Sequence, residues 1–229
     1  MSRKRKNFDS ASKKWQLFNA EAAYADSIFN MALGSTKRAV ASLKHALKLK
    51  PDYPPAVLTM GSIEYQRGRR SKGRSLFLSL LSLPENDCDI RHIIDTAGSF
   101  LIRSRQYSDG LDLYQGAVER FADRANLYQG LGCCAAHEGF HDEAITAYEK
   151  ALALDPNSQE LTNDLGWSLY ESGRLESARE VLLRAVSMDS SDELARENLR
   201  ICQQALSKES RIHDHESRSR PRSEPPEGR

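Results

Sequence analysis

Apolar residues along most of this chain recur with the period of an α-helix, and short polar stretches divide them into segments of helix length. In one segment Ala144, Tyr148 and Ala151 stand at i, i+4 and i+7, so small and large side chains share one helix face. Glycines such as Gly139 fall between neighbouring segments, where a residue with positive φ ends a helix. The pattern predicts amphipathic helices in pairs, joined by tight turns.

The predicted helix pairs repeat along the chain every 34 residues. Residues 127–156 superpose on residues 161–190 when shifted by that period. The matched positions are Leu131 on Leu165, Gly132 on Gly166, Gly139 on Gly173, Ala144 on Ala178, Tyr148 on Leu182 and Ala151 on Ala185. One period earlier the pattern holds Ala97, Gly98, Leu101, Gly110, Tyr114 and Ala117. Two more copies, reached after a correction of three residues, hold Met60, Gly61, Gly68, Gly73, Phe77 and Leu80, then Gly34, Ala39, Leu43, Ala46 and Pro51.

The pattern resembles the tetratricopeptide repeat (TPR), in which W-x2-L-G-x2-Y, A-x3-F and P recur every 34 residues. The resemblance covers residues 20–192. Ala135 departs from it where the first helix usually has an aromatic residue, Glu64 is polar at the equivalent place, and Asp26 and Asn30 interrupt the first copy. The resemblance implies an all-α fold, a right-handed α-solenoid of helix-turn-helix repeats with a concave and a convex side.

The glycines of the repeat have two expected roles. Glycine inside a helix costs about 1 kcal/mol relative to alanine, so it needs a packing reason. Close approach of the second helix is the expected reason at Gly61, Gly98, Gly132 and Gly166. Positive φ in the turn within each pair is expected at Gly34, Gly68, Gly139 and Gly173.

The chain is expected to consist of a solenoid over 9–207 between a disordered basic arm (1–8) and a disordered charged tail (208–229). The repeats are predicted at about 20–53, 54–87, 91–124, 125–158 and 159–192, followed by a capping helix at 193–207. In the capping helix the inward positions are predicted to be Leu194, Leu199, Cys202 and Leu206.

A long helix is predicted from Asp9 to Leu33, because no glycine or proline interrupts it. It carries one apolar stripe of Trp15, Phe18, Ala22, Ala25, Phe29 and Ala32. A second stripe beside it consists of Leu17, Tyr24, Ile28 and Met31. The apolar arc is wide for a terminal helix, so it either folds back onto the first repeat or joins a second copy in a homo-oligomer.

Composition narrows the class of protein. The chain has 229 residues and a formal net charge of +1, but residues 1–90 hold 16 basic and 8 acidic side chains, whereas residues 125–192 hold 4 and 12. No apolar run is long enough to span a bilayer, and no secretory signal follows the basic N-terminus. Four cysteines form no disulfide framework, so the expected location is cytoplasmic.

Signals for catalysis or metal binding are weak. The sequence contains no nucleophile elbow, P-loop or HExxH motif, so we expect no enzyme, no catalytic residue and no cofactor. Cys133, Cys134, His137 and His141 cluster in sequence, but His141 lies beyond the Gly139 turn and no second ligand pair exists elsewhere. We therefore expect packing cysteines and surface histidines rather than a metal site.

Two basic segments, Arg3–Lys6 and residues 67–74, suggest an alternative function in binding nucleic acid or an anionic surface. Aromatic residues for base stacking are sparse around them, and the second segment also suits a solvated helix–helix turn. Nucleic acid is therefore the less favoured partner.

The concave face is the favoured functional surface, because the family usually binds extended peptides there. The equivalent positions of the first helices are Ser62, Tyr65, His92, Asp95, Ser99, Arg103, Asn126, Gln129, Cys133, His137, Asn163, Trp167 and Tyr170. The contact residues expected among them are Tyr65, His92, Asp95, Arg103, Asn126, Gln129, His137, Asn163, Trp167 and Tyr170. The Lys/Asn/Arg set with which chaperone-binding members clamp a C-terminal carboxylate is not reproduced.

Trp167 and Tyr170 stand at i and i+3, so both rings are expected on one surface strip, as anchors for a ligand. The acidic Glu160 and Glu171 would select a ligand segment with Lys or Arg beside an apolar residue. Packing of Trp167 on the capping helix is the competing interpretation. The sequence as a whole indicates a non-catalytic adaptor or scaffold that binds a protein or peptide segment.

Overall fold

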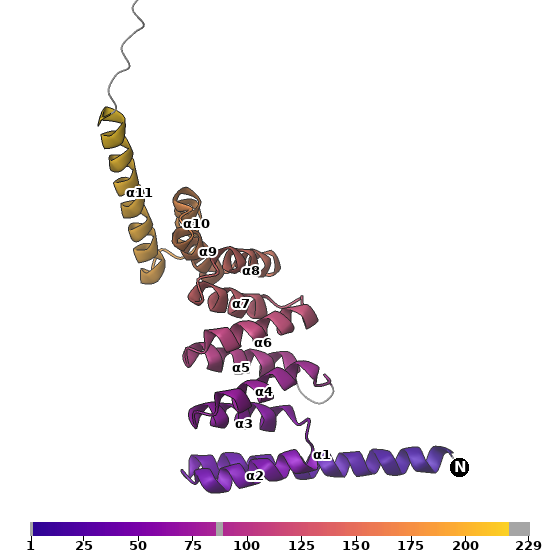
Figure 1. Ribbon diagram of the computed structural model, residues 1–229. Helices are drawn as coiled ribbons and strands as arrows, with labels where there is room; N and C mark the ends of the chain where they lie inside the picture. The colour runs from indigo at the N-terminus through magenta and orange to yellow at the C-terminus, as the bar shows by residue number, and fades with distance from the viewer. Residues whose placement is uncertain (1, 86–88, 220–229) are drawn as a thin grey trace, which may run out of the picture. The chain divides into compact units, whose positions relative to one another are not determined.

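The computed structural model describes residues 2–85 and 89–219, and the side chains of residues 14–85 and 89–211. All regular structure within these ranges is helical (Figure 1). Two long helices come first and last, α1 (Ser2–Ala32) and α11 (Glu193–Ser219). Between them lie α2 (Thr36–Leu49), α3 (Pro54–Gln66), α4 (Arg70–Ser79), the short 3-10 helix η1 (Leu80–Ser82), α5 (Ile90–Arg103), α6 (Tyr107–Arg120), α7 (Ala125–His137), α8 (His141–Leu154), α9 (Gln159–Glu171) and α10 (Leu175–Met188).

Helices α1 to α10 form five consecutive pairs, and α11 follows the last pair. The fold is an all-α helical repeat solenoid. The chain divides into two compact units, Met1–Gly130 (unit 1) and Leu131–Arg229 (unit 2), and the division falls inside α7.

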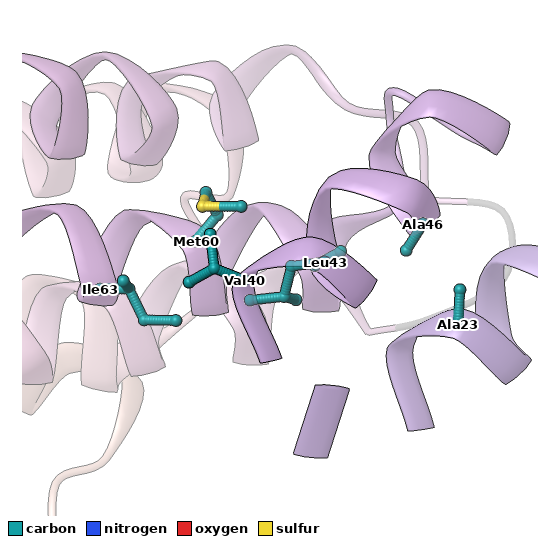
Figure 2. Close-up of a cluster of buried hydrophobic side chains, with 7 residues drawn as sticks. Ala23, Val40, Leu43, Ala46, Met60 and Ile63 are labelled. Carbon is teal, nitrogen blue, oxygen red and sulfur yellow. The ribbon is translucent and has the colours of Figure 1, made fainter. Parts of the chain in front are cut away.

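In unit 1 the helices pack first within their pairs, α1 on α2, α3 on α4 and α5 on α6. Neighbouring pairs join where α2 contacts α3, α3 contacts α5 and α4 contacts α6. Figure 2 shows the buried side chains that join the first two pairs: Ala23 from α1, Val40, Leu43 and Ala46 from α2, and Met60 and Ile63 from α3. Because these side chains come from both pairs, neither pair buries its apolar face alone.

In unit 2 α9 contacts α8 and α10, and α11 covers α10 and α9. The buried residues of α11 are Ala195, Asn198 and Cys202, and Leu199 and Leu206 are half-buried. The prediction that Leu194 points inward is wrong, because 61% of the surface of this residue is exposed. The buried stripe begins one residue later, since Leu194 lies at the helix start and its backbone N–H donates to the Asp192 carboxylate.

The repeat glycines lie where the second helix comes close. A Cβ atom added to Gly98 would lie 2.2 Å from the Tyr114 ring, and one added to Gly166 would lie 2.7 Å from Leu182. At Gly61 the corresponding distance to Phe77 is 2.4 Å. Separations this short are too small for carbon atoms, so a larger residue at these positions would force the facing side chain to shift, and the close approach is the one that the sequence predicted.

The turns within the pairs also follow the prediction. Gly34, Gly68, Gly139 and Gly173 have φ between 69° and 82°. The α5–α6 turn has Arg105 at the equivalent place, with φ 55°. The spacing between the second and third copies of the repeat is longer than the others, because the chain between α4 and α5 contains η1.

Both terminal helices are longer than predicted. Helix α1 begins at Ser2 rather than Asp9, and α11 continues to Ser219 rather than ending at 207. The expectation of disorder over 2–8 and 208–219 is therefore corrected, and residues 1 and 220–229 lie outside the described residues. Neither helix contains glycine or proline, and arginine and lysine are good helix formers.

Helix α1 packs on α2 with its small side chains. Ala20, Ala23 and Ser27 are buried, whereas the predicted stripe from Trp15 to Ala32 is exposed throughout. Small residues allow the two helix axes to approach closely, so the large side chains remain on the opposite side. The first stripe therefore does not fold back onto the first repeat, whereas Tyr24 of the second stripe packs against the core that α1 shares with α2 and α3.

Candidate functional site

A groove lies along the first helices of unit 1. Its lining comes from one residue of α1, five of α3 and three of α5: Met31, Leu58, Thr59, Ser62, Ile63, Gln66, Thr96, Phe100 and Arg103. Its volume is about 240 Å³. Pockets for small organic ligands commonly hold about 300–1,000 Å³, so this groove is smaller than that range.

The lining residues share helix faces because of their spacing. Thr59, Ser62 and Gln66 stand at i, i+3 and i+7 on α3, and Thr96, Phe100 and Arg103 stand at i, i+4 and i+7 on α5. Contact between α3 and α5 brings the two faces together.

The groove combines an apolar floor with hydroxyl groups. Phe100 is fixed by Tyr65 and Phe77, with ring centroids 5.8 Å and 5.7 Å away, and Ile63 is buried. Ser62 Oγ donates to the Leu58 carbonyl (3.1 Å), and Thr96 Oγ1 donates to the His92 carbonyl (2.8 Å). Thr59 Oγ1 shares a hydrogen bond of 3.3 Å with the Tyr24 hydroxyl.

One charged side chain, Arg103, belongs to the lining. It is exposed, and within the described part of the chain it forms no ion pair. An unpaired guanidinium beside an apolar floor attracts a carboxylate and offers it two parallel N–H donors.

Tyr65, a predicted contact residue, serves the fold beside the groove. Its hydroxyl donates to Asp109 Oδ2 (2.9 Å), and Asp109 is buried against Arg70 (Nε to Oδ2, 2.7 Å) and Arg74 (Nε to Oδ1, 3.3 Å). Burial, and then the hydrogen bond to Asp109, raise the pKa of Tyr65 above its usual range. Gly73 leaves room for the ring, since a Cβ there would lie 2.4 Å from it. The hydroxyl is therefore committed to the α3–α6 contact.

The other predicted residues of unit 1 lie outside the groove lining. His92 is exposed at the start of α5, and Asp95 is half-buried and accepts from the Tyr114 hydroxyl (3.2 Å). On α7, Asn126 is exposed and Gln129 is half-buried.

Among the predicted contact residues of unit 2, the prediction for Asn163 is wrong. It is 4% exposed and accepts a hydrogen bond from Asn198 Nδ2 (3.0 Å), so it joins α9 to α11 instead of facing a ligand. His137 is exposed at the end of α7. Trp167 and Tyr170 are half-buried and stack, with centroids 4.9 Å apart and an interplanar angle of 31°.

The cysteines of α7 are protonated thiols at neutral pH. Burial, and then the nearby Asp164, raise the pKa of Cys133 to about 11. Burial, and then the neighbouring Cys133 and Glu138, raise the pKa of Cys134 to about 12. His141 Nδ1 lies 3.7 Å from Glu171 Oε2, beyond hydrogen-bond distance. Over the residues that the structure describes, no three potential metal ligands gather at one place.

Three of the five basic side chains in the segment 67–74 form ion pairs within the fold. Arg69 Nε lies 3.2 Å from the buried Glu64 carboxylate, Arg70 pairs with Asp109, and Arg74 pairs with Asp109 and Asp112. The pairing also explains how α3 carries the buried Glu64 at a position that the repeat usually fills with an apolar residue. Arg67 and Lys72 of this segment are exposed.

Sequence reasoning identified Ser62 and Arg103 in the groove but missed Met31, Leu58, Thr59, Ile63, Gln66, Thr96 and Phe100. A signal for several of them exists in the 37-residue offset between the second and third copies. That offset aligns Thr59 with Thr96, Ile63 with Phe100 and Gln66 with Arg103.

The stacked helix pairs and the groove on their first helices define an α-helical repeat protein. Family models described as tetratricopeptide repeat match residues 27–53, 97–158 and 135–199. The small glutamine-rich tetratricopeptide repeat-containing protein 2 of Mycosarcoma maydis is 26% identical over 113 residues, which are 49% of this chain and 32% of that protein. The chain therefore spans about a third of the length of this relative.

Solved structures show the same fold. MamA (residues 41 to the end) from Desulfovibrio magneticus RS-1 superposes with a TM-score of 0.55 at 21% identity, over 76% of this chain and 97% of MamA. YrrB has the same TM-score and identity, over 76% of this chain and 89% of its own. The chain is a tetratricopeptide-repeat domain protein. No helix in the described ranges is both long enough and apolar enough to cross a membrane.

Proposed function

We propose that this protein is a non-catalytic adaptor that binds an extended segment of a partner protein in the groove of unit 1. The observation that carries the proposal is the unpaired Arg103 at a groove with an apolar floor, lined from α1, α3 and α5. Related structures support the class of function, since YrrB is described as a TPR protein with an unusual peptide-binding site.

The lining favours a particular ligand chemistry. An aliphatic or aromatic side chain fits against Phe100, Ile63 and Met31, and a neighbouring Asp, Glu or C-terminal carboxylate fits Arg103. Apolar burial supplies most of the binding energy, whereas the charge supplies selectivity.

A random peptide display library tests this function. Selection on the full chain should enrich segments in which an apolar residue neighbours an acidic one. Ser62→Phe, which fills the groove without removing a core contact, should weaken the selected peptides at least about tenfold. Arg103→Glu should exchange the acidic preference for a basic one.

Lys72→Glu is the matched control, because it makes the same charge change at an exposed position of α4. It should leave binding unchanged, and circular dichroism should show all variants folded. Enrichment of one unrelated motif that neither groove variant affects would contradict the proposal, as would binding of random nucleic acid with a steep salt dependence.

In unit 2 we propose the stacked Trp167 and Tyr170 as a second anchor. Glu160 and Glu171 are exposed on the same helix, so this anchor would prefer a segment with Lys or Arg beside an apolar residue. The exposed His92, Asn126 and His137, together with Asp95 and Gln129, remain proposed outer contacts of the first helices. We place the adaptor in the reducing cytoplasm, since Cys133, Cys134 and Cys202 are free thiols.

A further inference from the structure

Helix α1 carries a long apolar stripe that nothing within unit 1 covers over the described residues. Trp15, Phe18 and Phe29 are 66%, 63% and 64% exposed, and the exposed Ala22 and Ala25 lie between them. The rings of Trp15 and Phe18 meet edge to face, with centroids 6.3 Å apart. The opposite side of the helix is already occupied, because Ala20, Ala23 and Ser27 are buried on the side that packs against α2.

The spacing of the stripe indicates the shape of its partner. Residues 15, 18, 22, 25, 29 and 32 alternate steps of three and four, which is the a/d seam of a coiled coil. The seam is about 26 Å long at 1.5 Å per residue. A straight seam of this kind is complementary to another helix with the same spacing.

We propose that α1 pairs antiparallel with α1 of a second copy of this chain. In the antiparallel pair Phe18 of one copy lies opposite Phe29 of the other, Trp15 lies opposite Ala32, and Ala22 lies opposite Ala25. Large side chains thus meet small ones at both ends, and the two alanines let the helix axes approach at the centre. Both copies use the same surface, so the pair is closed by a two-fold axis.

Charge selects the antiparallel arrangement over the parallel one. Beside the seam, Glu21 stands at a g position and Asp26 at the next e position. In a parallel pair these carboxylates would face each other across the interface twice, which is repulsive. In the antiparallel pair the exposed Asp26 faces the exposed Asn19, whose amide can donate to it.

The exposed area sets the strength of the pair. An aromatic side chain buries about 150–250 Å² when fully covered, so three that are about two-thirds exposed give roughly 800 Å² over both copies. Stable interfaces bury at least about 1,200 Å². The dimer should therefore form with rising concentration rather than be permanent.

Sedimentation velocity on the full chain tests the pair, from about 1 µM to about 500 µM. The wild type should shift from monomer to dimer across this range. Phe18→Lys and Phe29→Glu should each raise the dimer dissociation constant at least about tenfold and leave a monomer.

An equimolar mixture of the two variants should dimerise again. The antiparallel pair places the lysine introduced at position 18 of one chain opposite the glutamate introduced at position 29 of the other. The remaining contact between Phe29 of the first chain and Phe18 of the second stays intact, so the mixed dimer replaces one aromatic contact with an ion pair.

Leu183→Lys is the matched control, since Leu183 is an exposed leucine of α10, outside the stripe. It should dimerise like the wild type, and all variants should keep the wild-type melting temperature because the changed side chains are exposed. A wild-type chain that stays monomeric at every concentration would overturn the proposal and would indicate that the stripe binds a different protein. A dimer that resists both substitutions, or a mixture that stays monomeric, would overturn the antiparallel pairing.

Discussion

Arg105 is the one residue other than glycine, within the described ranges, that has a positive φ. It occupies the turn between α5 and α6, where the other four pairs have glycine. A Cβ atom in the left-handed region meets the following carbonyl oxygen, at a cost of about 1–2 kcal/mol. The third pair therefore carries a local backbone strain that the other four lack.

Replacing Arg105 with glycine should raise the free energy of unfolding by about 0.5–1 kcal/mol, because the relieved strain exceeds the entropy that glycine loses on folding. Urea denaturation measures the change. Arg105→Ala keeps the Cβ atom and should leave the stability near the wild-type value. An equal rise in the free energy of unfolding for both variants would mean that the guanidinium group, and not the backbone conformation, destabilises the wild type.

Two tyrosines should make the protein sensitive to alkali. Burial raises the pKa of Tyr148, and burial together with the hydrogen bond to Asp109 raises that of Tyr65, so the fold keeps both protonated above pH ~10 where the unfolded chain releases its protons. Stability should therefore fall as pH rises above about 10, by up to about 1.4 kcal/mol per pH unit for the buried Tyr148. The half-buried Tyr65 should add a smaller slope, because solvent screens it.

Urea denaturation between about pH 9 and pH 11 measures this slope. Tyr148→Phe cannot ionise, so its slope should be shallower than that of the wild type above pH ~10. Tyr107→Phe changes a tyrosine outside this pair and serves as the comparison. Parallel slopes for wild type and Tyr148→Phe would contradict the assignment to that residue.

At the scale of elements, the helix pairs were predictable because each is encoded locally. The 34-residue period located the close approaches at Gly98 and Gly166, and the turn glycines located the ends of the first helices. These features depend on residues that are near in sequence or one period apart, so a single sequence reveals them.

The orientation of α1 was not predictable in this way. Hydrophobicity would bury Trp15, Phe18 and Phe29, but α2 packs on the side of Ala20, Ala23 and Ser27, where the axes can come close. The burial of Asn163 has a similar cause. Its partner Asn198 lies 35 residues away on α11, and no local sequence pattern predicts a buried pair of amide side chains.

The stacked pair on α9 gives a prediction at this scale. Trp167→Ala should weaken a selected basic and apolar peptide by about 2 kcal/mol or more if the ring anchors the ligand. The melting temperature should change little, because Trp167 is only half-buried. Isothermal titration and thermal unfolding measure the two effects. A drop of several degrees with unchanged affinity would show that the ring stabilises unit 2 instead.

At the scale of the whole molecule, the packed part of the solenoid ends inside α11. The buried and half-buried positions of α11 run from Ala195 to Leu206, and residues 207–211 are exposed. The exposed residues that follow Leu206 therefore add length without adding to the core of unit 2.

Truncation after Lys208 should leave the thermal midpoint within about 1 °C of the full chain, because the removed residues whose side chains are described, 209–211, are exposed. Truncation after Asp192 removes α11 entirely, and with it the apolar contacts of Ala195 and Cys202 and the hydrogen bond from Asn198 to Asn163. The midpoint should then fall by several degrees, measured by circular dichroism. Equal midpoints for the two truncations would show that α11 does not cap the repeats.

The hydroxyl groups of the groove limit which features of a bound segment they can recognise. Ser62 and Thr96 give their protons to carbonyls of their own helices, so only lone pairs point outward from these two side chains. Lone pairs are matched by backbone N–H groups, which every peptide segment carries whatever its sequence. If the groove binds a peptide as proposed, its wall would contact the main chain of the partner, and Phe100 and Arg103 would select the partner's side chains.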